Sequence, residues 1–137
     1  MKSIIATLLV LLVAVSSCKK DAVLRTQSYT IVPQNSSGIT GTVTFKELTD
    51  ATQTQVDIQL QHTIWNSMYI CHIHDGPPTN YHGASFTFDA YAVGNQLSYQ
   101  KNISLSYDSA LRYDGTFVLH DSTGNQLLGR CGIGKNG

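Results

Sequence analysis

Regular alternation of apolar and polar residues is the feature that most restricts what this chain can fold into. It is clearest in "SGITGTVTFKEL" (37–48) and in "TQVDIQLQHTI" (54–64). The apolar positions there are Ile39, Gly41, Val43 and Phe45, followed by Val56, Ile58 and Leu60. Period-2 patterning predicts strands with one buried and one solvated face.

Further short strand-like segments follow, most of them bounded by Gly, Asn, Asp or Pro, and no window shows a 3.6-residue stripe. Several short strands separated by turn signals predict an all-β fold, an antiparallel sandwich or barrel.

The first residues are typical of an export signal. An apolar run from Ile4 to Val15, broken by Thr7, ends in Ser16-Ser17-Cys18. The run is too short to span a bilayer. The cysteine after small residues resembles the lipobox of bacterial lipoproteins, which implies cleavage before Cys18 and lipid on its thiol. An ordinary signal peptide that contains a cysteine is the alternative.

Three regions are therefore expected: a signal peptide over residues 1–17, a lipidated N-terminus and tether over 18–26, and one β-domain over 27–137. Lipid chains would hold the domain at a bacterial membrane, in the cell envelope, without a spanning helix.

Charge excludes one class of function. The chain has 9 basic and 9 acidic residues and a formal net charge of zero. It has no basic stripe, so nucleic-acid binding has no electrostatic basis here. In an exported protein disulfides can persist, and with Cys18 lipidated only Cys71 and Cys131 remain. Sequence alone leaves open whether these two bond.

The five histidines are the candidate ligands. In "YICHIHDGPP", His72 and His74 lie two residues apart on a predicted strand, so they share a face, roughly 6.6–7 Å apart at Cα. His120 ends another strand, "TFVLH", and His82 follows the Asp-Gly-Pro-Pro turn closely enough to fold back over the pair. Imidazoles so placed could converge on one metal ion. His62 is interpreted as a structural residue at a strand end.

Several segments, in order over roughly residues 38–134, together resemble the copper/zinc superoxide dismutase family. "GITGTVTFKE" is similar to the family's early strand pair, and "CHIHDG" to its H-x-H strand. "ISLSYDSALRYDGTFVLHD" is similar to the segment that leads to its later histidine strand, and "GNQLLGRCGIG" to its closing stretch.

This resemblance implies a Greek-key β-barrel with an immunoglobulin-like sandwich architecture, a copper cofactor and superoxide as substrate. By position, His72, His74 and His120 match copper ligands, and His82 is the candidate for the remaining, bridging ligand. Arg130 lies near the position of the substrate-guiding arginine, slightly displaced. Cys131 matches a cysteine of the family's disulfide, for which Cys71 is the only partner left.

The sequence departs from the family in two loops, and these differences change the metal content that is expected. The segment from Asp75 to Phe86 is short and lacks the extra histidines of a zinc site, and the loop between His120 and Cys131 is cut back. Zinc is therefore not expected, and the chain resembles the copper-only branch. Asp75 and Asp121 follow ligand candidates and could orient them, but turn formation or solvation is the simpler explanation of both.

Two other classes of protein share the H-x-H feature with a dismutase. A non-catalytic copper-binding or chordin-like domain of bacterial lipoproteins also carries an H-I-H-like strand. A cupin also uses H-x-H on a barrel, but it needs a glutamate shortly after the pair, where this chain has Gly-Pro-Pro-Thr-Asn.

Overall fold

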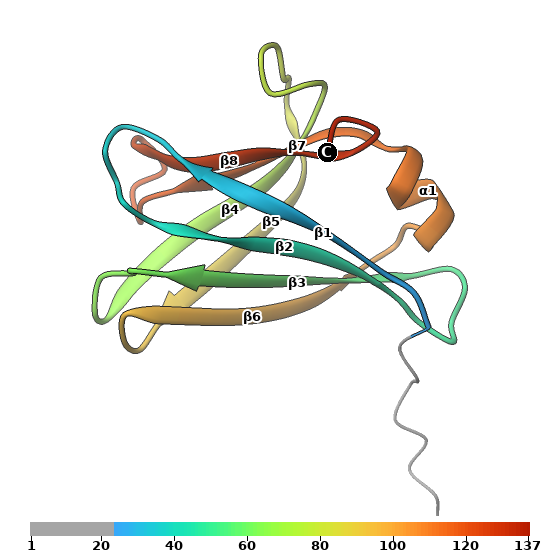
Figure 1. The fold of residues 1–137 in the computed structure, drawn as a ribbon, viewed down its shortest axis with the longest axis horizontal. Helices are drawn as coiled ribbons and strands as arrows, with labels where there is room; N and C mark the ends of the chain where they lie inside the picture. The colour runs from blue at the N-terminus through green and yellow to red at the C-terminus, as the bar shows by residue number, and fades with distance from the viewer. Residues whose placement is uncertain (1–23) are drawn as a thin grey trace, which may run out of the picture.

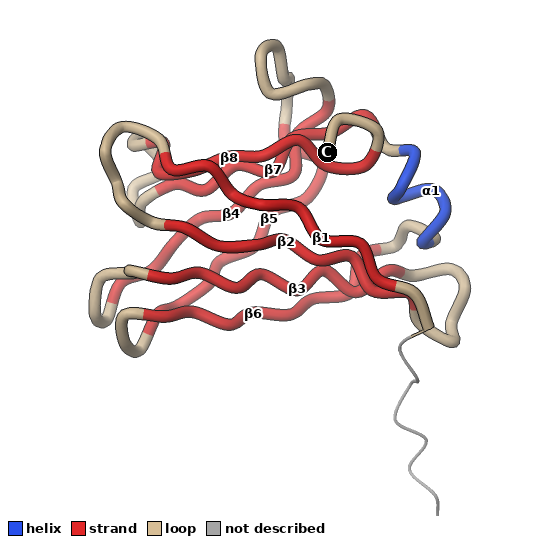
Figure 2. The backbone as a smooth tube through the Cα atoms, in the orientation of Figure 1, coloured by secondary structure: helices blue, strands red, loops and turns tan. Residues whose placement is uncertain are grey.

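The computed structural model describes residues 24–137, which form eight strands and one short helix. The strands are β1 (Thr26–Pro33), β2 (Thr40–Glu47), β3 (Thr54–Gln61), β4 (Ser67–Asp75), β5 (Ala84–Ala92), β6 (Gln96–Ile103), β7 (Asp114–His120) and β8 (Leu127–Gly134), and the helix is α1 (Tyr107–Arg112). Strands dominate the backbone, as Figure 2 shows. The predicted all-β class is confirmed.

The strands form one antiparallel, nearly closed barrel in the order β5-β4-β7-β8-β1-β2-β3-β6 (Figure 1). β1 joins the two halves, because Thr26–Ile31 pair with β2 whereas Val32 and Pro33 pair with β8. β7 returns to lie beside β4 after β5 and β6, which is a Greek-key connection. β5 and β6 are the two edges of the sheet. The topology places the two histidine-bearing strands, β4 and β7, side by side.

The core fills the barrel with the alternating apolar residues that the sequence predicts. Val43, Val56, Ile58 and Leu60 are fully buried. Gly41 shares this inner face because it is paired with Leu60 across the ladder. A Cβ at position 41 would lie 2.0 Å from the carbonyl oxygen of Gln59. A side chain at position 41 would therefore push the paired strands β2 and β3 apart.

Helix α1 has no counterpart among the elements expected from the sequence. Ser106 caps it by accepting a hydrogen bond from the backbone N–H of Ser109 (3.3 Å), and Asp108 lies in its first turn. At six residues it is too short to show a helical stripe of apolar residues. Arg25 anchors the chain beside it, with Nη2 3.0 Å from Asp108 Oδ1.

Leu24 and Arg25, which the sequence placed in the tether, are already bonded to β2. The Leu24 N–H donates to the carbonyl of Glu47 (3.3 Å), and Arg25 Nε lies 2.7 Å from Glu47 Oε2. The expected signal peptide, Cys18 and most of the tether lie outside the described residues. Within residues 24–137, no helix has the length and apolar character needed to cross a membrane.

Candidate metal centre

β4 presents two imidazoles on the outside of the barrel. Along the strand Tyr69, Cys71 and Ile73 are buried, whereas His72 and His74 are intermediate in exposure. This alternation follows from the pleat of a strand, which turns successive side chains to opposite faces. The ring centroids of His72 and His74 lie 5.3 Å apart.

β7 brings His120 to the same face. His120 is paired with Ile70 across the ladder, and Val118 with His72. Residues paired across a ladder share a face, so the ring of His120 points to the side of the sheet that carries the β4 pair. Its centroid lies 5.5 Å from that of His72.

Three histidines therefore form one group. One ring nitrogen from each of His72, His74 and His120 lies within 4.8 Å of the others. Two of these rings have a buried nitrogen without a hydrogen-bond partner in the described part of the chain, namely His74 Nε2 and His120 Nδ1. Buried polar atoms are usually paired, so unpaired nitrogens that converge on one point are suited to a metal ion.

Backbone contacts orient two of the rings. His74 Nδ1 lies 2.5 Å from the carbonyl oxygen of His82, and the His120 ring is hydrogen-bonded to the backbone of Gln126. When one imidazole nitrogen is held by a carbonyl, the other is left to coordinate a metal. In each ring, the nitrogen that contacts the backbone thus determines which nitrogen is left to face the other histidines.

Burial favours the neutral form of two of the imidazoles, those of His72 and His120. It lowers the pKa of His72, and the neighbouring His74 and His120 lower it further, against an opposing effect of Asp89. Burial also lowers the pKa of His120, against the opposing hydrogen bond to the Gln126 backbone. Metal ligation requires the neutral form, so the environment favours the ligating state of both rings.

His82 lies close to the group but contributes its backbone rather than its ring. Its imidazole is exposed and is not one of the three clustered rings, whereas its carbonyl oxygen faces His74. The loop is folded back by a hydrogen bond from the His82 N–H to the Asp75 carbonyl (2.7 Å). The structure therefore brings together three of the four histidines predicted as ligands.

Arg130 holds the loop that covers this face. Its Nη1 donates to the carbonyl oxygen of Pro78 (3.0 Å). The ladder pairs Arg130 with Val118, which is paired in turn with His72, so Arg130 lies on the same outer face as the histidines. Val118 is fully buried on this outer face because neighbouring groups cover it.

Tyr81 was not singled out in the sequence. Its ring lies 4.9 Å from that of His74, at an interplanar angle of 54°. The only sequence signal for this contact was the position of Tyr81, directly before the candidate ligand His82 in a short loop. Its contact depends on a loop conformation that sequence patterning does not specify.

The two aspartates considered as orienting groups have structural roles. The Asp75 carboxylate accepts from Tyr113 Oη and from Ser85 Oγ (2.9 Å). The Asp121 carboxylate accepts from the hydroxyl of Thr123 and from backbone N–H groups of its own turn. Both support backbone next to a clustered histidine.

Cys71 and Cys131 are free and buried. They lie on β4 and β8, and β7 separates these strands. Neighbouring strands are ~4.8 Å apart, which puts the Cα atoms ~10 Å apart and beyond the ~7 Å that a disulfide can bridge. Both side chains point into the core, away from the histidine group.

Comparison with known proteins gives no family: no family model matches the chain, and no curated protein matches it. The site must therefore be interpreted from its own chemistry.

Proposed function

We propose that the protein is a copper-binding, superoxide dismutase-like lipoprotein that converts superoxide to oxygen and hydrogen peroxide. The observation that carries the proposal is the convergence of His72, His74 and His120 within 4.8 Å. The sequence resemblance to the copper-only branch of the superoxide dismutase family, which includes the same histidines, also supports it.

The donor set fits copper. Imidazole nitrogen is a preferred ligand of copper, and this group contains no thiolate that would favour zinc or iron–sulfur chemistry. Copper, when bound, would supply the change between Cu(II) and Cu(I) that takes an electron from one superoxide and returns it to another. The described residues hold no second group of three metal-ligating side chains for a structural zinc.

In this proposal the protein holds two of the ligand rings in a fixed orientation. The backbone carbonyl of His82 orients the His74 ring, and the Gln126 backbone orients that of His120. Arg130, on the same outer face, would attract the superoxide anion, since a guanidinium has more N–H donors than the one bonded to Pro78. Cys18 would carry the lipid that places the domain at a membrane surface in the bacterial cell envelope.

The test is copper reconstitution of the chain from residue 19 onward, which contains every described strand, with metal analysis and superoxide consumption measured on the same sample. We expect one copper ion per chain and a superoxide turnover above that of the metal-free chain. Absence of copper binding would contradict the metal centre itself.

A second candidate is a non-catalytic copper-binding or chordin-like domain. The observation that favours it is the exposed imidazole of His82, which leaves three clustered rings rather than four. In the reconstitution experiment, tight copper binding without superoxide turnover would select this candidate.

A further inference from the structure

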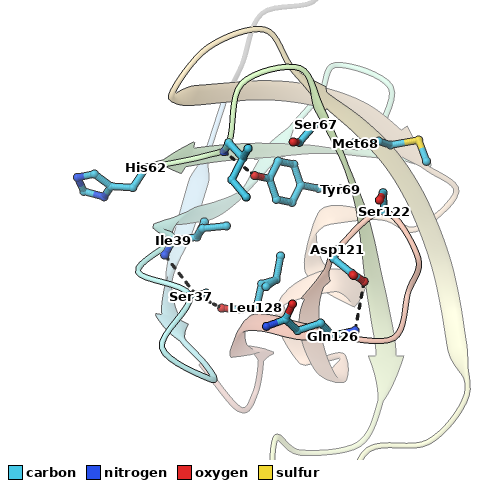
Figure 3. A pocket seen from close by; sticks show the side chains of 11 residues that line it. Ser37, Ile39, His62, Ser67, Met68, Tyr69, Asp121, Ser122, Gln126 and Leu128 are labelled. Atoms are coloured by element: carbon cyan, nitrogen blue, oxygen red, sulfur yellow. Dashed lines mark hydrogen bonds between the residues drawn. The ribbon is translucent and has the colours of Figure 1, made fainter.

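A cavity lies at one end of the barrel. Its volume is about 270 Å³, and it opens between the loops 34–39, 62–66 and 121–126 (Figure 3). These loops follow β1, β3 and β7, so the cavity is at the end where β1 finishes, opposite the end where Thr26 begins it. It adjoins the outer face that carries the histidine group, because Asp121 of its lining follows His120 in the chain, but none of His72, His74 and His120 lines it.

The floor of this cleft is apolar. Ile39, Tyr69 and Leu128 line it and are 2%, 2% and 8% exposed. The hydroxyl oxygen of Tyr69 accepts from the backbone N–H of Ile64 (2.7 Å), and its O–H can still donate. The floor therefore presents mostly carbon to whatever occupies the cleft.

The rim carries polar groups that the fold does not use. Ser122 and Gln126 line the cleft and are exposed, and no hydrogen bond within residues 24–137 involves the Ser122 hydroxyl or the Gln126 side-chain amide. Only the backbone of Gln126 takes part in its turn, donating to Asp121 Oδ1 (3.1 Å). An apolar floor with a few unused polar groups around it is the usual composition of a small-ligand site.

The charge of the lining restricts the ligand. No lysine or arginine is among the lining residues, and the ring of His62, the lining residue that can become cationic, is directed away from the other lining side chains (Figure 3). The lining therefore offers little to balance a phosphate or carboxylate. The acidic residue of the lining, Asp121, has its carboxylate engaged by its own turn. A neutral molecule with hydroxyl groups and an apolar face matches this lining best.

The loop 62–66 adds an aromatic surface. Ile64 and Trp65 are 68% and 69% exposed, and His62 and Asn66 have positive φ values of 62° and 51°. Left-handed backbone at non-glycine residues costs free energy and is concentrated at functional loops. Trp65 does not line the cleft itself but follows Ile64, which does. An exposed indole can pack against the C–H face of a ring and donate its N–H.

From these observations we infer that the cleft binds a neutral sugar ring, with its apolar face toward the floor and its hydroxyls toward Ser122 and Gln126. For a single ring the affinity is expected in the millimolar range. The inference does not depend on the copper centre, so it is tested on metal-free protein.

The test is titration of the chain from residue 19 onward with glucose and with N-acetylglucosamine. Trp65 is the only tryptophan, so its fluorescence gives a local signal, and ¹H–¹⁵N NMR shifts give a second. At least one of the sugars should cause saturable NMR shifts confined to the three loops. Absence of saturable shifts with both sugars would overturn the inference, as would inorganic phosphate binding in the same place.

Two neighbouring substitutions provide the matched comparison. Gln126→Ala removes an unused amide and should weaken sugar binding about fivefold, the value of one net hydrogen bond. Asn125→Ala removes an equally exposed amide on the same turn that does not line the cleft, and should leave affinity unchanged. Ser122→Phe, which fills the cleft from its exposed rim, should abolish binding. Equal weakening by the two amide substitutions, or full binding by Ser122→Phe, would contradict the assignment.

Discussion

At the scale of single residues, the candidate centre is defined by the different contacts of the two nitrogens in an imidazole ring. His74 and His120 each use one ring contact to a backbone group and leave a second, buried nitrogen unpaired. His82 takes part through its carbonyl oxygen, which any residue could supply.

Replacement of His120 by Ala should therefore lower copper affinity sharply. Loss of an outer hydrogen-bond partner of a ligand costs about 10–100-fold, so loss of a ligand should cost more than about 100-fold. His82→Ala is the matched variant, because it removes an exposed ring but keeps the carbonyl, and should change affinity less than about threefold. Isothermal titration with Cu(II) measures both. Similar losses in the two variants would show that the His82 ring is also a ligand.

The thiols of Cys71 and Cys131 should be inert while the protein is folded. Burial raises the pKa of each to about 12. The thiolate is the reactive form, so little of it is present at pH 8. A chromogenic disulfide reagent should titrate both thiols of the chain from residue 19 onward only after denaturant is added. Rapid reaction of either thiol in the native protein would contradict the buried placement.

The sequence predicts the placement of some residues of the site but not of others. The shared face of His72 and His74, and the outward direction of His120 beside inward Phe117 and Leu119, follow from strand parity and are confirmed by the ladder. The placement of the His82 ring could not be predicted this way. It depends on the path of a loop that Arg130 and Asp75 hold through backbone carbonyls.

At the scale of elements, the alternation that identifies the strands also positions a buried charge. Asp57 lies on β3 and is only 5% exposed. Burial alone would raise its pKa, but hydrogen bonds from Lys46 on β2, Gln59 on β3 and Gln100 on β6 offset this effect, and the pKa is lowered overall. One carboxylate thus joins three neighbouring strands. The sequence predicted the strands, but it did not predict this pairing, which requires their order.

A lowered pKa in the folded state means that the Asp57 carboxylate stabilises the fold above its unfolded pKa, near 4, and that this contribution is lost as pH falls through the folded value. Asp57→Asn should cost about 2 kcal/mol of unfolding free energy at pH 7, because hydrogen bonds to a charged group are replaced by weaker ones. Urea denaturation of both proteins from pH 7 to pH 2 measures this. The difference should shrink at the acidic end, and a constant difference would contradict the assignment.

At the scale of the whole molecule, the barrel separates three regions. The described chain begins at the Thr26 end of β1, opposite the loops that follow β1, β3 and β7 (Figure 1). The histidine group lies on the outer face of β4 and β7, and the cleft opens between those loops. The described loops at the cleft end therefore lie at the opposite end of the barrel from Thr26, where β1 begins. The all-β class could be predicted, since period-2 patterning needs no tertiary information, whereas the Greek-key barrel was expected only from the resemblance to the superoxide dismutase family. The short helix α1 could not, because its six residues are held by contacts with Arg25.

The balanced charge of the chain has a consequence for substrate capture. With 9 basic and 9 acidic residues, the molecule has no net attraction for an anion. Electrostatic steering, which can raise association rates by about 10–10³-fold, should contribute little. Superoxide turnover of the copper-loaded chain, measured by pulse radiolysis, should change less than about twofold between 10 mM and 150 mM salt. A steep fall in rate with salt would show local steering, for which Arg130 is the nearest candidate.

The most direct test of the copper centre is electron paramagnetic resonance of the chain from residue 19 onward after addition of one equivalent of Cu(II). If His72, His74 and His120 bind one ion, a single Cu(II) species should appear, with hyperfine splitting from imidazole nitrogens that the triple alanine variant lacks. A spectrum without nitrogen splitting, or one unchanged in that variant, would contradict the centre.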